Sequence, residues 1–586
     1  MVQDSVESSE RSTGAEPTGT GGTEFNLAAI HEAVEAAVGD RDCIVARRPD
    51  GSTDRRTYAE VGARTRRLAN ALRARGLGHV TDRSELSTHE SGQDHVALYL
   101  HNCPEYLESM LGAYKARTVP FNVNYRYVAE ELEYLLRDAG ARAIVFHSAF
   151  APTLAEVRDR LGDLEVLIQV PDDSGNALLD GAEWFEDVLA DQPDVLPDDL
   201  VSSWSPDDLY MLYTGGTTGM PKGVLWRQAD IFVAAMGGRR NEDQQEWSSY
   251  DQIGTNAVNG GVRLLPGPPF MHGAAHWVAF NFFTNANTIV LPSVTDHLDT
   301  DDLLATVAAE GVNVILIVGD AFGRPLADAL EEAVAAGTHD TSSILAIASG
   351  GAALSPGVKA RLLAALPSII VMDGLGASET GQQGTQLSAA GQETSTGDFT
   401  PGPGMCILSE DLTRVLDPGH DEMGWLGQSG RVPLGYLGDE AKTARTFPVI
   451  GGVRYAVPGD RARVTAEGRL ELFGRDSVTI NSGGEKIFAE EVEQAILRHP
   501  AVRDCVVAGR PSERWGSEVV AVVAVDEGSS VTDDELVAEA ARHIARYKLP
   551  KAVVRRDVLQ RSPSGKADYR WAAAQAAAAD ATAGSA

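Results

Sequence analysis

LYTGGTTGMPKGV, residues 212–224, is a glycine- and threonine-rich turn that follows an apolar run expected to form a strand. Glycines let backbone N–H groups turn toward an anion, while threonine hydroxyls and the Lys222 ammonium add donors suited to phosphate oxygens. The residues that would form this grip are Thr214, Gly215, Gly216, Thr217, Thr218, Gly219 and Lys222. The order Lys-Gly differs from the Gly-Lys-Ser/Thr of a Walker loop, so the turn predicts a phosphate site of another kind.

The length and charge of the chain set the first limits on its function. At 586 residues the chain is longer than one hydrophobic core supports, so two or more domains are expected. The formal net charge of −34 argues against nucleic acid or an anionic membrane as a partner. An anionic ligand would need a local, focused positive site, because the overall field repels it. A small-molecule partner is therefore favoured.

Cysteine usage and hydropathy favour a cytoplasmic protein. The four cysteines include no CxxC pair, so neither a zinc site nor a disulfide framework is indicated. Residues 1–25 lack the apolar core of a signal peptide, and no stretch reaches the roughly 18 apolar residues of a membrane span. We expect a soluble, cytoplasmic protein with no membrane span, and a homodimer is compatible with the sequence.

Short apolar runs alternate with helical patterns over the first 400 residues or so and predict an α/β fold. Such runs are typical of parallel strands that are covered by helices on both faces. They occur at 95–100, 143–148, 166–170, 288–292, 313–318, 345–351 and 369–374. In open α/β sheets ligands bind beyond the carboxyl ends of the strands, so the motifs that follow these runs are candidate site residues.

Changes in composition divide the chain into four parts. Residues 1–25 are expected to be a disordered extension, and residues 26–475 a large domain of mostly parallel sheets with a β subdomain after residue 400. A small α+β domain follows at 476–570, and residues 571–586 form a low-complexity tail. Residues 80–94 are polar and are interpreted as a surface insertion.

A second glycine-rich turn, GLGASETG at 374–381, follows the apolar run IIVMD. Its glycines permit a flat ring to lie close to the backbone, and Leu375 offers such a ring an apolar face. Glu379 supplies a hard carboxylate oxygen of the kind that Mg²⁺ prefers beside phosphates. An isolated glutamate would more often be a surface residue, so the metal-ligand interpretation rests on its neighbours.

Two histidines, His272 and His276, stand four residues apart in PPFMHGAAH and could suggest a metal pair. The segment lacks the glutamate of HExxH, and its proline pair and Gly273 make a helix start there unfavourable. Zinc is therefore not favoured.

Taken in order, these stretches resemble the motifs of the adenylate-forming superfamily, which contains acyl-CoA synthetases, the adenylation domains of peptide synthetases and beetle luciferases. The resemblance covers about residues 28–570. The chain departs from the usual pattern at Gly215, where serine is usual, and at Leu375 and Ser378, where an aromatic residue and threonine are usual. Ser477 stands at the usual hinge position, which Asp or Lys commonly occupies.

The resemblance implies a site for ATP and Mg²⁺ and a role for each matching residue. Thr214 and Glu379 would act in catalysis and hold Mg²⁺, and Lys566 in RSPSGKADY would be the catalytic lysine. His272 would orient the substrate carboxylate or gate the pantetheine tunnel. The further cofactor contacts would be Gly351, Ala352, Gly374, Leu375, Gly376 and Ser378 around adenine, Asp460 and Arg475 at ribose or phosphate, and Gly483 and Gly484 at pantetheine.

The same resemblance implies a two-step ligase. A carboxylate attacks the α-phosphorus of ATP to give an acyl adenylate and pyrophosphate, and the thiol of coenzyme A then displaces AMP. Rotation of a mobile C-terminal domain would present Lys566 for the first step and the Gly483-Gly484 segment for the second. No carrier domain follows Lys566, which favours free coenzyme A as the acceptor.

The acyl group is left open by the sequence. Several segments resemble an actinobacterial branch of fatty acyl-CoA synthetases that includes ligases for steroid side-chain carboxylates, so a fatty acid and a steroid acid both remain candidates. The acyl pocket is expected around Trp277 and Gly319-Asp320-Ala321, with residues 277–283 along its wall, in the helix core, or both. Two alternatives stay open, namely an acyl-AMP ligase that loads a carrier protein and a non-catalytic acyl-adenylate binder.

Overall fold

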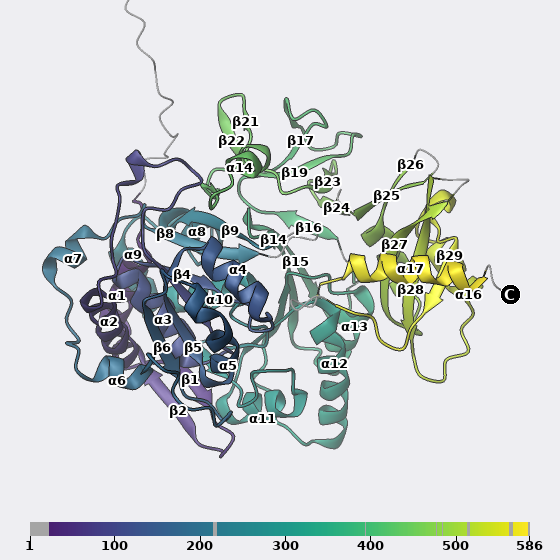
Figure 1. Ribbon diagram of the computed structural model, residues 1–586. Coiled ribbons are helices and arrows are strands. Elements are labelled where there is room, and N and C mark those ends of the chain that lie inside the picture. Colours follow the sequence, from purple (N-terminus) through teal and green to yellow (C-terminus); the bar gives the residue numbers. More distant parts are fainter. Residues whose placement is uncertain are drawn as a thin grey trace, which may run out of the picture.

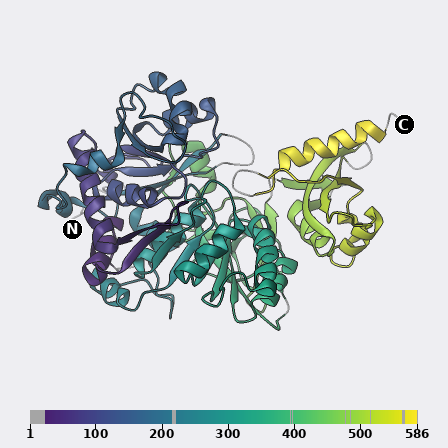
Figure 2. The same ribbon diagram turned by 90° about the horizontal axis from the view of Figure 1, so that it is seen from below.

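The structure is a computed structural model that describes residues 23–214, 220–392, 394–395, 397–475, 478–482, 485–512, 516–561 and 566–583. Figure 1 shows a large body, coloured from purple to green, and a smaller C-terminal unit that carries α17 (Tyr569–Ala583). Seen from below, the two are distinct masses (Figure 2).

A fully parallel sheet with the order β4-β3-β5-β6-β7 lies in the first third of the chain. All residues of β3, β4 and β6 are buried, as expected for strands that are covered on both faces. The bounds are β3 His95–Tyr99, β4 Val119–Asn122, β5 Ala141–His147, β6 Val166–Val170, β7 Glu183–Trp184, α3 Pro104–Lys115, α4 Ala129–Asp138, α5 Ala151–Val157 and α6 Phe185–Ala190.

Within the described ranges the largest sheet has 16 strands, and its central part is parallel. The neighbours β1, β11, β10, β12, β13 and β14 pair in parallel, while β2 and β15 flank them in antiparallel pairings. This arrangement confirms the predicted α/β class. The bounds are β1 Asp42–Arg47, β2 Thr53–Thr57, β10 Arg263–Pro266, β11 Thr288–Leu291, β12 Val314–Ile317, β13 Ala346–Gly350, β14 Ile370–Ala377 and β15 Gly381–Ala389.

Helices cover both faces of this central part. Two of them, α12 and α13, pack their apolar side chains on one face, and α10 lies on the other side with the cavity described below. The bounds are α1 Leu27–Val38, α2 Tyr58–Ala74, α7 Asp198–Ser203, α8 Gln228–Ala235, α9 Tyr250–Ala257, α10 Gly273–Thr284, α11 Thr300–Glu310, α12 Gly319–Ala336 and α13 Pro356–Ala365.

The β subdomain that was predicted after residue 400 continues the large sheet, because β15 pairs with β16 and β16 with β24. A separate three-stranded sheet, β20-β9-β8, lies nearby. The bounds are β8 Leu209–Thr214, β9 Lys222–Arg227, β16 Asp398–Pro401, β17 Met405–Leu408, β18 Val415–Leu416, β19 Gly424–Ser429, β20 Gly435–Tyr436, β21 Val449–Ile450, β22 Val453–Ala456, β23 Asp460–Val464, β24 Leu470–Arg475 and α14 Glu440–Thr446.

The C-terminal unit is a small α+β sheet domain. Its bounds are β25 Thr479–Ser482, β26 Glu485–Phe488, β27 Val502–Ser512, β28 Gly516–Val525, β29 Ala552–Arg555, α15 Ala489–Leu497 and α16 Asp533–Ala540. Thr532 and Glu535 form the capping box that begins α16. Helix α17 runs across the predicted boundary at residue 570, because alanine favours helix and its buried Ala572 and Ala576 pack with the sheet.

The chain joins the folded body before residue 26, where the predicted extension was placed to end. Phe25 is 1% exposed and its ring lies 5.4 Å from that of Phe232. The insertion at 80–94 lies on the surface with a bridge between Val80 and Gln93. It also contacts the segment after β20 through the His89 carbonyl, which accepts a hydrogen bond of 2.8 Å from the Gly438 N–H.

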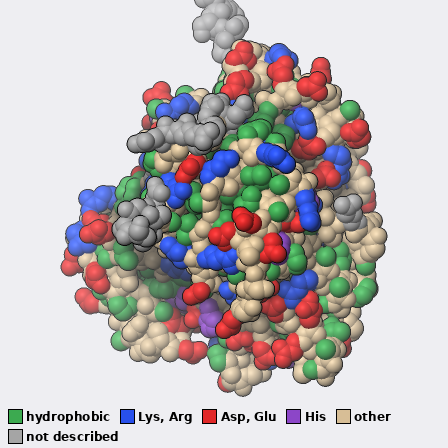
Figure 3. Space-filling view, turned by 90° about the vertical axis from the view of Figure 1, so that its right-hand side faces the viewer, with side chains coloured by type: hydrophobic (Ala, Val, Ile, Leu, Met, Phe, Trp, Pro, Cys, Tyr) green, Lys and Arg blue, Asp and Glu red, His purple; other side chains and the backbone are tan. Residues whose placement is uncertain are grey.

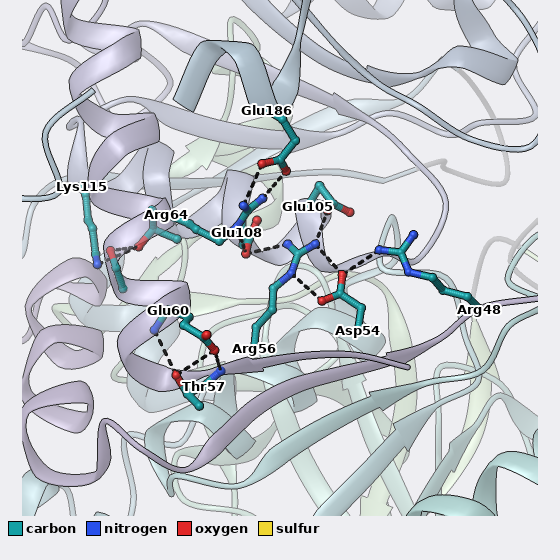
Figure 4. A network of polar contacts seen from close by, with 12 residues as sticks. Arg48, Asp54, Arg56, Thr57, Glu60, Arg64, Glu105, Glu108, Lys115 and Glu186 are labelled. Carbon is teal, nitrogen blue, oxygen red and sulfur yellow. Dashed lines mark hydrogen bonds and ion pairs between the residues drawn. The ribbon is translucent and has the colours of Figure 1, made fainter. Parts of the chain in front are cut away.

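A network of charged residues ties β2, α2, α3 and α6 together (Figure 4). The Glu108 carboxylate, 1% exposed, lies 2.8 Å from Arg56 and 2.8 Å from Arg64, and Arg64 continues to Glu186 at 2.6 Å. Because Glu108 is desolvated, the two arginines stabilise its negative charge.

Acidic and basic side chains are interspersed over the face drawn in Figure 3, in spite of the net charge of −34. Among the helices that the structure describes, none combines the length and the hydrophobicity needed to cross a bilayer.

Candidate active site

A cavity of about 2480 Å³ lies beyond the carboxyl ends of the central parallel strands and reaches the C-terminal unit. Its wall includes Thr214 at the end of β8, His272 at the start of α10, Gly374 on β14, and Lys566. These residues are more than 350 positions apart at the extremes and meet only through the fold. The cavity therefore brings together four motifs that the sequence had singled out separately.

The phosphate-grip turn connects two strands of a hairpin. Thr214 and Lys222 are Cα partners in the β8–β9 register, so the turn between them is closed at its base. Thr214 lines the cavity. The Lys222 ammonium lies 4.0 Å from carboxylate oxygens of both Asp138 and Asp439 and is not part of the cavity wall. The predicted contacts Gly215, Gly216, Thr217, Thr218 and Gly219 lie outside the described residues.

The predicted adenine contacts lie where β13 ends beside β14, with Gly350 and Gly374 in register. Gly351 has a φ of +86°, a conformation that favours glycine, and it opens onto the cavity. Leu375, Gly376 and Ser378 also line the cavity. Ala352 does not line the cavity. Its methyl group lies near Gly319 instead, and a Cβ added at Gly319 would be 2.9 Å from the Ala352 Cβ.

Glu379, the predicted metal ligand, accepts a hydrogen bond of 2.7 Å from the Tyr436 hydroxyl at Oε1. Lys442 stands over the Tyr436 ring at 3.9 Å, where burial lowers the pKa of its ammonium and Glu379 acts to raise it. The Glu379 carboxylate and the Thr214 hydroxyl are hard oxygen donors, which is the chemistry that Mg²⁺ selects. Thr214 lines the cavity, whereas Glu379 is not among its lining residues. The chemistry of both donors fits the metal, and the assignment stays a prediction.

The two histidines have different surroundings. His272 occupies the N-cap position of α10, without a capping hydrogen bond from its side chain, and it lines the cavity. The expectation that a helix start is unfavourable there was wrong. Gly273 is closely packed at this helix start, because an added Cβ would lie 2.9 Å from Leu212 and 3.1 Å from Trp277. His276 is buried, with Nδ1 at 2.7 Å from the Phe270 carbonyl and Nε2 at 2.5 Å from the Tyr210 hydroxyl. Burial lowers the pKa of His276 to about 4, so this ring is a neutral core residue.

The predicted ribose contacts face each other, since Asp460 and Arg475 are Cα partners between β23 and β24. The Arg475 side chain lies outside the described residues, as do Ser477, Gly483 and Gly484. Lys566 lines the cavity from the C-terminal unit, the placement that its predicted role in adenylation requires. Its role is still a prediction.

One positioning residue was missed by the sequence reasoning. Asn122, at the carboxyl end of β4, donates from Nδ2 to the Tyr213 carbonyl at 2.9 Å and to the Met271 carbonyl at 2.7 Å. Its Oδ1 accepts from the Tyr213 N–H at 2.8 Å. Tyr213 and Met271 directly precede Thr214 and His272, so one buried amide fixes the approach to both. The available signal was a polar residue at the end of the apolar run TVPFN.

A network of charged groups around the cavity was also missed, because its members are far apart in the sequence. Arg431 lies 2.8 Å from Glu24, 3.1 Å from Asp230 and 2.9 Å from Glu246. Burial alone would lower the pKa of the Arg431 guanidinium, and these carboxylates raise it above its usual value. Arg227 pairs with Glu24 as well. Arg227 also pairs with Asp207 and Asp230, so carboxylates neutralise both arginines and the network supplies no net positive charge to the cavity.

An apolar channel extends the cavity along one face of the central sheet. Alternate residues of β12 and β13, Leu316, Ala346 and Ala348, line it, while Ile315 and Ile347 between them pack with the opposite core. The facing wall is α10, whose cavity residues recur at helical spacing. They are Trp277, Val278, Asn281, Phe282 and Asn285.

This channel confirms that residues 277–283 contribute to both a cavity wall and the helix core. The Trp277 ring is fixed by a hydrogen bond of 2.7 Å from its Nε1 to the Tyr210 hydroxyl. The expectation for Gly319-Asp320-Ala321 was wrong, because none of the three lines the cavity. Asp320 instead pairs with Arg324 at 2.8 Å at the start of α12.

Comparison with known proteins agrees with this geometry. Residues 31–427 match the model of the AMP-binding enzyme family, and residues 491–566 match that of the AMP-binding enzyme C-terminal domain. The chain is 54% identical over 559 residues to a medium-chain acyl-CoA ligase of Mycobacterium avium, covering 94% of this chain and 98% of the relative. It is 39% identical over 530 residues to a 3-oxocholest-4-en-26-oate–CoA ligase of Rhodococcus rhodochrous, covering 88% and 90%.

Solved structures show the same fold. An anthranilate CoA ligase in complex with anthranoyl-AMP superimposes with a TM-score of 0.75 at 20% identity, covering 95% of this chain and 98% of that one. An ATP-bound protein of Rhodopseudomonas palustris gives a TM-score of 0.73 at 22% identity, with 94% and 99% covered. The chain belongs to the AMP-binding enzyme family, in which it groups with the ATP-dependent acyl-CoA ligases.

Proposed function

We propose that this acyl-CoA synthetase activates fatty acids of medium or greater chain length. The observation that carries the proposal is the apolar channel that leads from His272 and Gly351 along α10. A carboxylate held at the His272 end would have its hydrocarbon chain between the helix and the alternate apolar residues of β12 and β13. Burying such a chain contributes about 0.8 kcal/mol per methylene, so the channel would favour acids long enough to fill it.

The polar end of the cavity would perform the adenylation. Thr214 and Glu379 would hold Mg²⁺, which when bound neutralises phosphate charge, and the Lys566 ammonium would stabilise the charge that develops between the carboxylate and the α-phosphate. Coenzyme A would then attack the acyl carbon from the side of the C-terminal unit. We retain free coenzyme A as the acceptor, and a cytoplasmic location and a homodimer stay predictions.

A steroid side-chain acid is a second candidate substrate. The sheet wall of the channel consists partly of small residues, Ala346, Ala348 and Gly350, which leave more width than isoleucine or leucine would. The relative from Rhodococcus rhodochrous is named for such an acid. A cavity of about 2480 Å³ holds the nucleotide end and a wide acyl group together.

Pyrophosphate release from Mg·ATP, measured over a panel of acids with and without coenzyme A, tests the proposal. The panel runs from hexanoate to palmitate and includes steroid side-chain acids. We expect release with linear acids that rises with chain length until the channel is filled, and acyl-CoA formation only when coenzyme A is present. Release with steroid acids alone would replace the fatty acid assignment. ATP binding without release on any acid would favour the non-catalytic binder, and acyl transfer to a carrier protein but not to coenzyme A would favour the carrier ligase.

A further inference from the structure

The channel wall formed by α10 changes character with depth. Its first turns present Trp277 and Val278, and the next present Asn281 beside Phe282. Opposite lie the apolar side chains of Val314 and Leu316 and the methyl groups of β13. A carboxamide in the middle of an apolar wall needs an explanation, because hydrocarbon substrates offer it no hydrogen bond.

The Asn281 amide has hydrogen-bonding capacity to spare. Across the described part of the chain, neither its Oδ1 nor its Nδ2 makes a hydrogen bond, although its side chain lines the cavity. The next asparagine on this face differs, since Asn285 accepts from Asn256 Nδ2 at 3.0 Å and donates to the Asn281 carbonyl at 2.9 Å. Asn287 uses its Oδ1 to accept from the N–H groups of Gly261 and Val262. The side-chain amides of Asn285 and Asn287 thus form hydrogen bonds within the fold, whereas the described residues provide none for the Asn281 amide.

The backbone around Asn281 is closely packed. Gly237 approaches the Asn281 backbone so closely that a Cβ at Gly237 would lie 3.2 Å from the Asn281 Cα. Gly237 has a φ of +93°, so the loop after α8 is shaped to pass over this point of α10. Asn281 therefore lies against a covered part of the channel.

The depth of Asn281 follows from helix geometry. It is eight residues beyond Gly273, and at 1.5 Å per residue this places it about 12 Å from the His272 end of the channel. With C–C bonds of about 1.5 Å, an extended chain of roughly ten carbons spans this distance. A purely apolar chain that passes Asn281 would remove water from the amide without replacing its hydrogen bonds, at a cost of about tenfold in affinity.

We propose that Asn281 selects hydrophobic carboxylic acids that carry a hydroxyl or oxo oxygen about 12 Å from the carboxylate. The inference rests on the proposed function and narrows its substrate class. The Nδ2 group would donate to an oxo or hydroxyl oxygen, and Oδ1 would accept from a hydroxyl. An oxygenated fatty acid and an oxidised polycyclic acid share this chemistry, and the substrates in the test separate them.

The test compares 10-hydroxydecanoate with undecanoate, which differ only in a terminal hydroxyl against a methyl group. Their kcat/KM values for pyrophosphate release are measured in the wild type, in Asn281→Leu and in Asn285→Leu. We expect the wild type to favour the hydroxy acid about tenfold and Asn281→Leu to reverse the preference. Asn285→Leu is the matched control on the same helix face, and it should change both acids alike because its amide is already paired.

Each outcome supports or overturns the role of Asn281 in substrate selection. A wild type that prefers undecanoate, or a ratio that Asn281→Leu leaves unchanged, overturns the role of Asn281 while fatty acid activation still stands. A wild type that releases pyrophosphate with neither linear acid and with no steroid acid overturns the proposed function together with this inference. Thermal unfolding of each variant shows whether it is folded. If Asn281→Leu is not folded, the ratio of kcat/KM for the two acids in the wild type tests the role of Asn281 by itself. A wild type that accepts an oxo-steroid acid but neither linear acid assigns Asn281 to a polycyclic substrate.

Discussion

Replacing Asn122 by leucine should uncouple Thr214 and His272 without touching either residue. The substitution removes the three hydrogen bonds of 2.7–2.9 Å that join β4 to Tyr213 and Met271. It leaves one buried N–H group and two carbonyls without that partner. At about 1 kcal/mol for each bond, the free energy of unfolding should fall by roughly 3 kcal/mol.

The effect on catalysis should be larger than the effect on stability implies. Thr214 and His272 each follow a tethered residue, so both would shift, and misplacement by about 1 Å costs on the order of 10²-fold in rate. The assay is pyrophosphate release at saturating Mg·ATP, with urea unfolding measured in parallel. We expect kcat to fall more than KM rises.

Asn70 offers a matched control for Asn122→Leu. It also donates to two carbonyls, those of Pro193 at 2.8 Å and Val195 at 3.1 Å, but it lies on α2 and not on the cavity wall. Asn70→Leu should lower the free energy of unfolding by about 2 kcal/mol for its two hydrogen bonds. It should leave kcat within about twofold, because neither Asn70 nor the carbonyls that it binds line the cavity. Equal losses of kcat in the two variants would refute the positioning role of Asn122.

Three further predictions follow from the site and the core. Lys566→Ala should slow adenylation by about 10²–10³-fold yet largely spare coenzyme A transfer from supplied acyl-AMP, and equal loss of both half-reactions would contradict this division. Glu108→Ala should lower the free energy of unfolding by about 2–3 kcal/mol because it removes the buried carboxylate that Arg56 and Arg64 share, although both arginines keep other partners. Glu186→Ala, whose side chain is 59% exposed, should cost under about 1 kcal/mol in the same urea titration. Because burial holds the pKa of His276 at about 4, its contribution to stability is present above pH 6.5 and is lost as the pH falls toward 4. His276→Gln should then flatten the pH dependence of unfolding over that range by about 1.4 kcal/mol per pH unit, and a parallel curve would count against it.

The predictable parts of this protein are those in which local sequence and local structure agree. Buried strands such as HVALYL were found because an apolar run between turn residues has few alternative conformations. Thr214 and Gly374 could be singled out because each begins a glycine-rich segment directly after an apolar run, and the structure places both on the cavity wall. Their roles in phosphate and adenine binding stay predictions. For the same reason Lys566 could be placed in the site although it lies far along the chain.

The errors have a common physical cause. Gly319-Asp320-Ala321 was placed at the acyl pocket, yet the face of a strand or helix that meets a cavity depends on which neighbours occupy the other face. The helix start at His272 looked unfavourable in isolation, but Asn122 on a distant strand holds the segment before it by the Met271 carbonyl. Local rules are overridden where tertiary hydrogen bonds fix the backbone.

Substrate choice belongs to this second class, which is why the sequence left it open. Trp277 and Asn281 stand one turn apart on α10, and in the sequence both appear as residues of the helix segment WVAFNFF. Only the fold shows that both line the channel, and that the amide of Asn281, unlike that of Asn285, has no partner within the described structure. An unpaired amide at a defined depth indicates what the channel binds, because water or a substrate oxygen must supply its hydrogen bonds. The acyl group is therefore to be sought among acids that can do so.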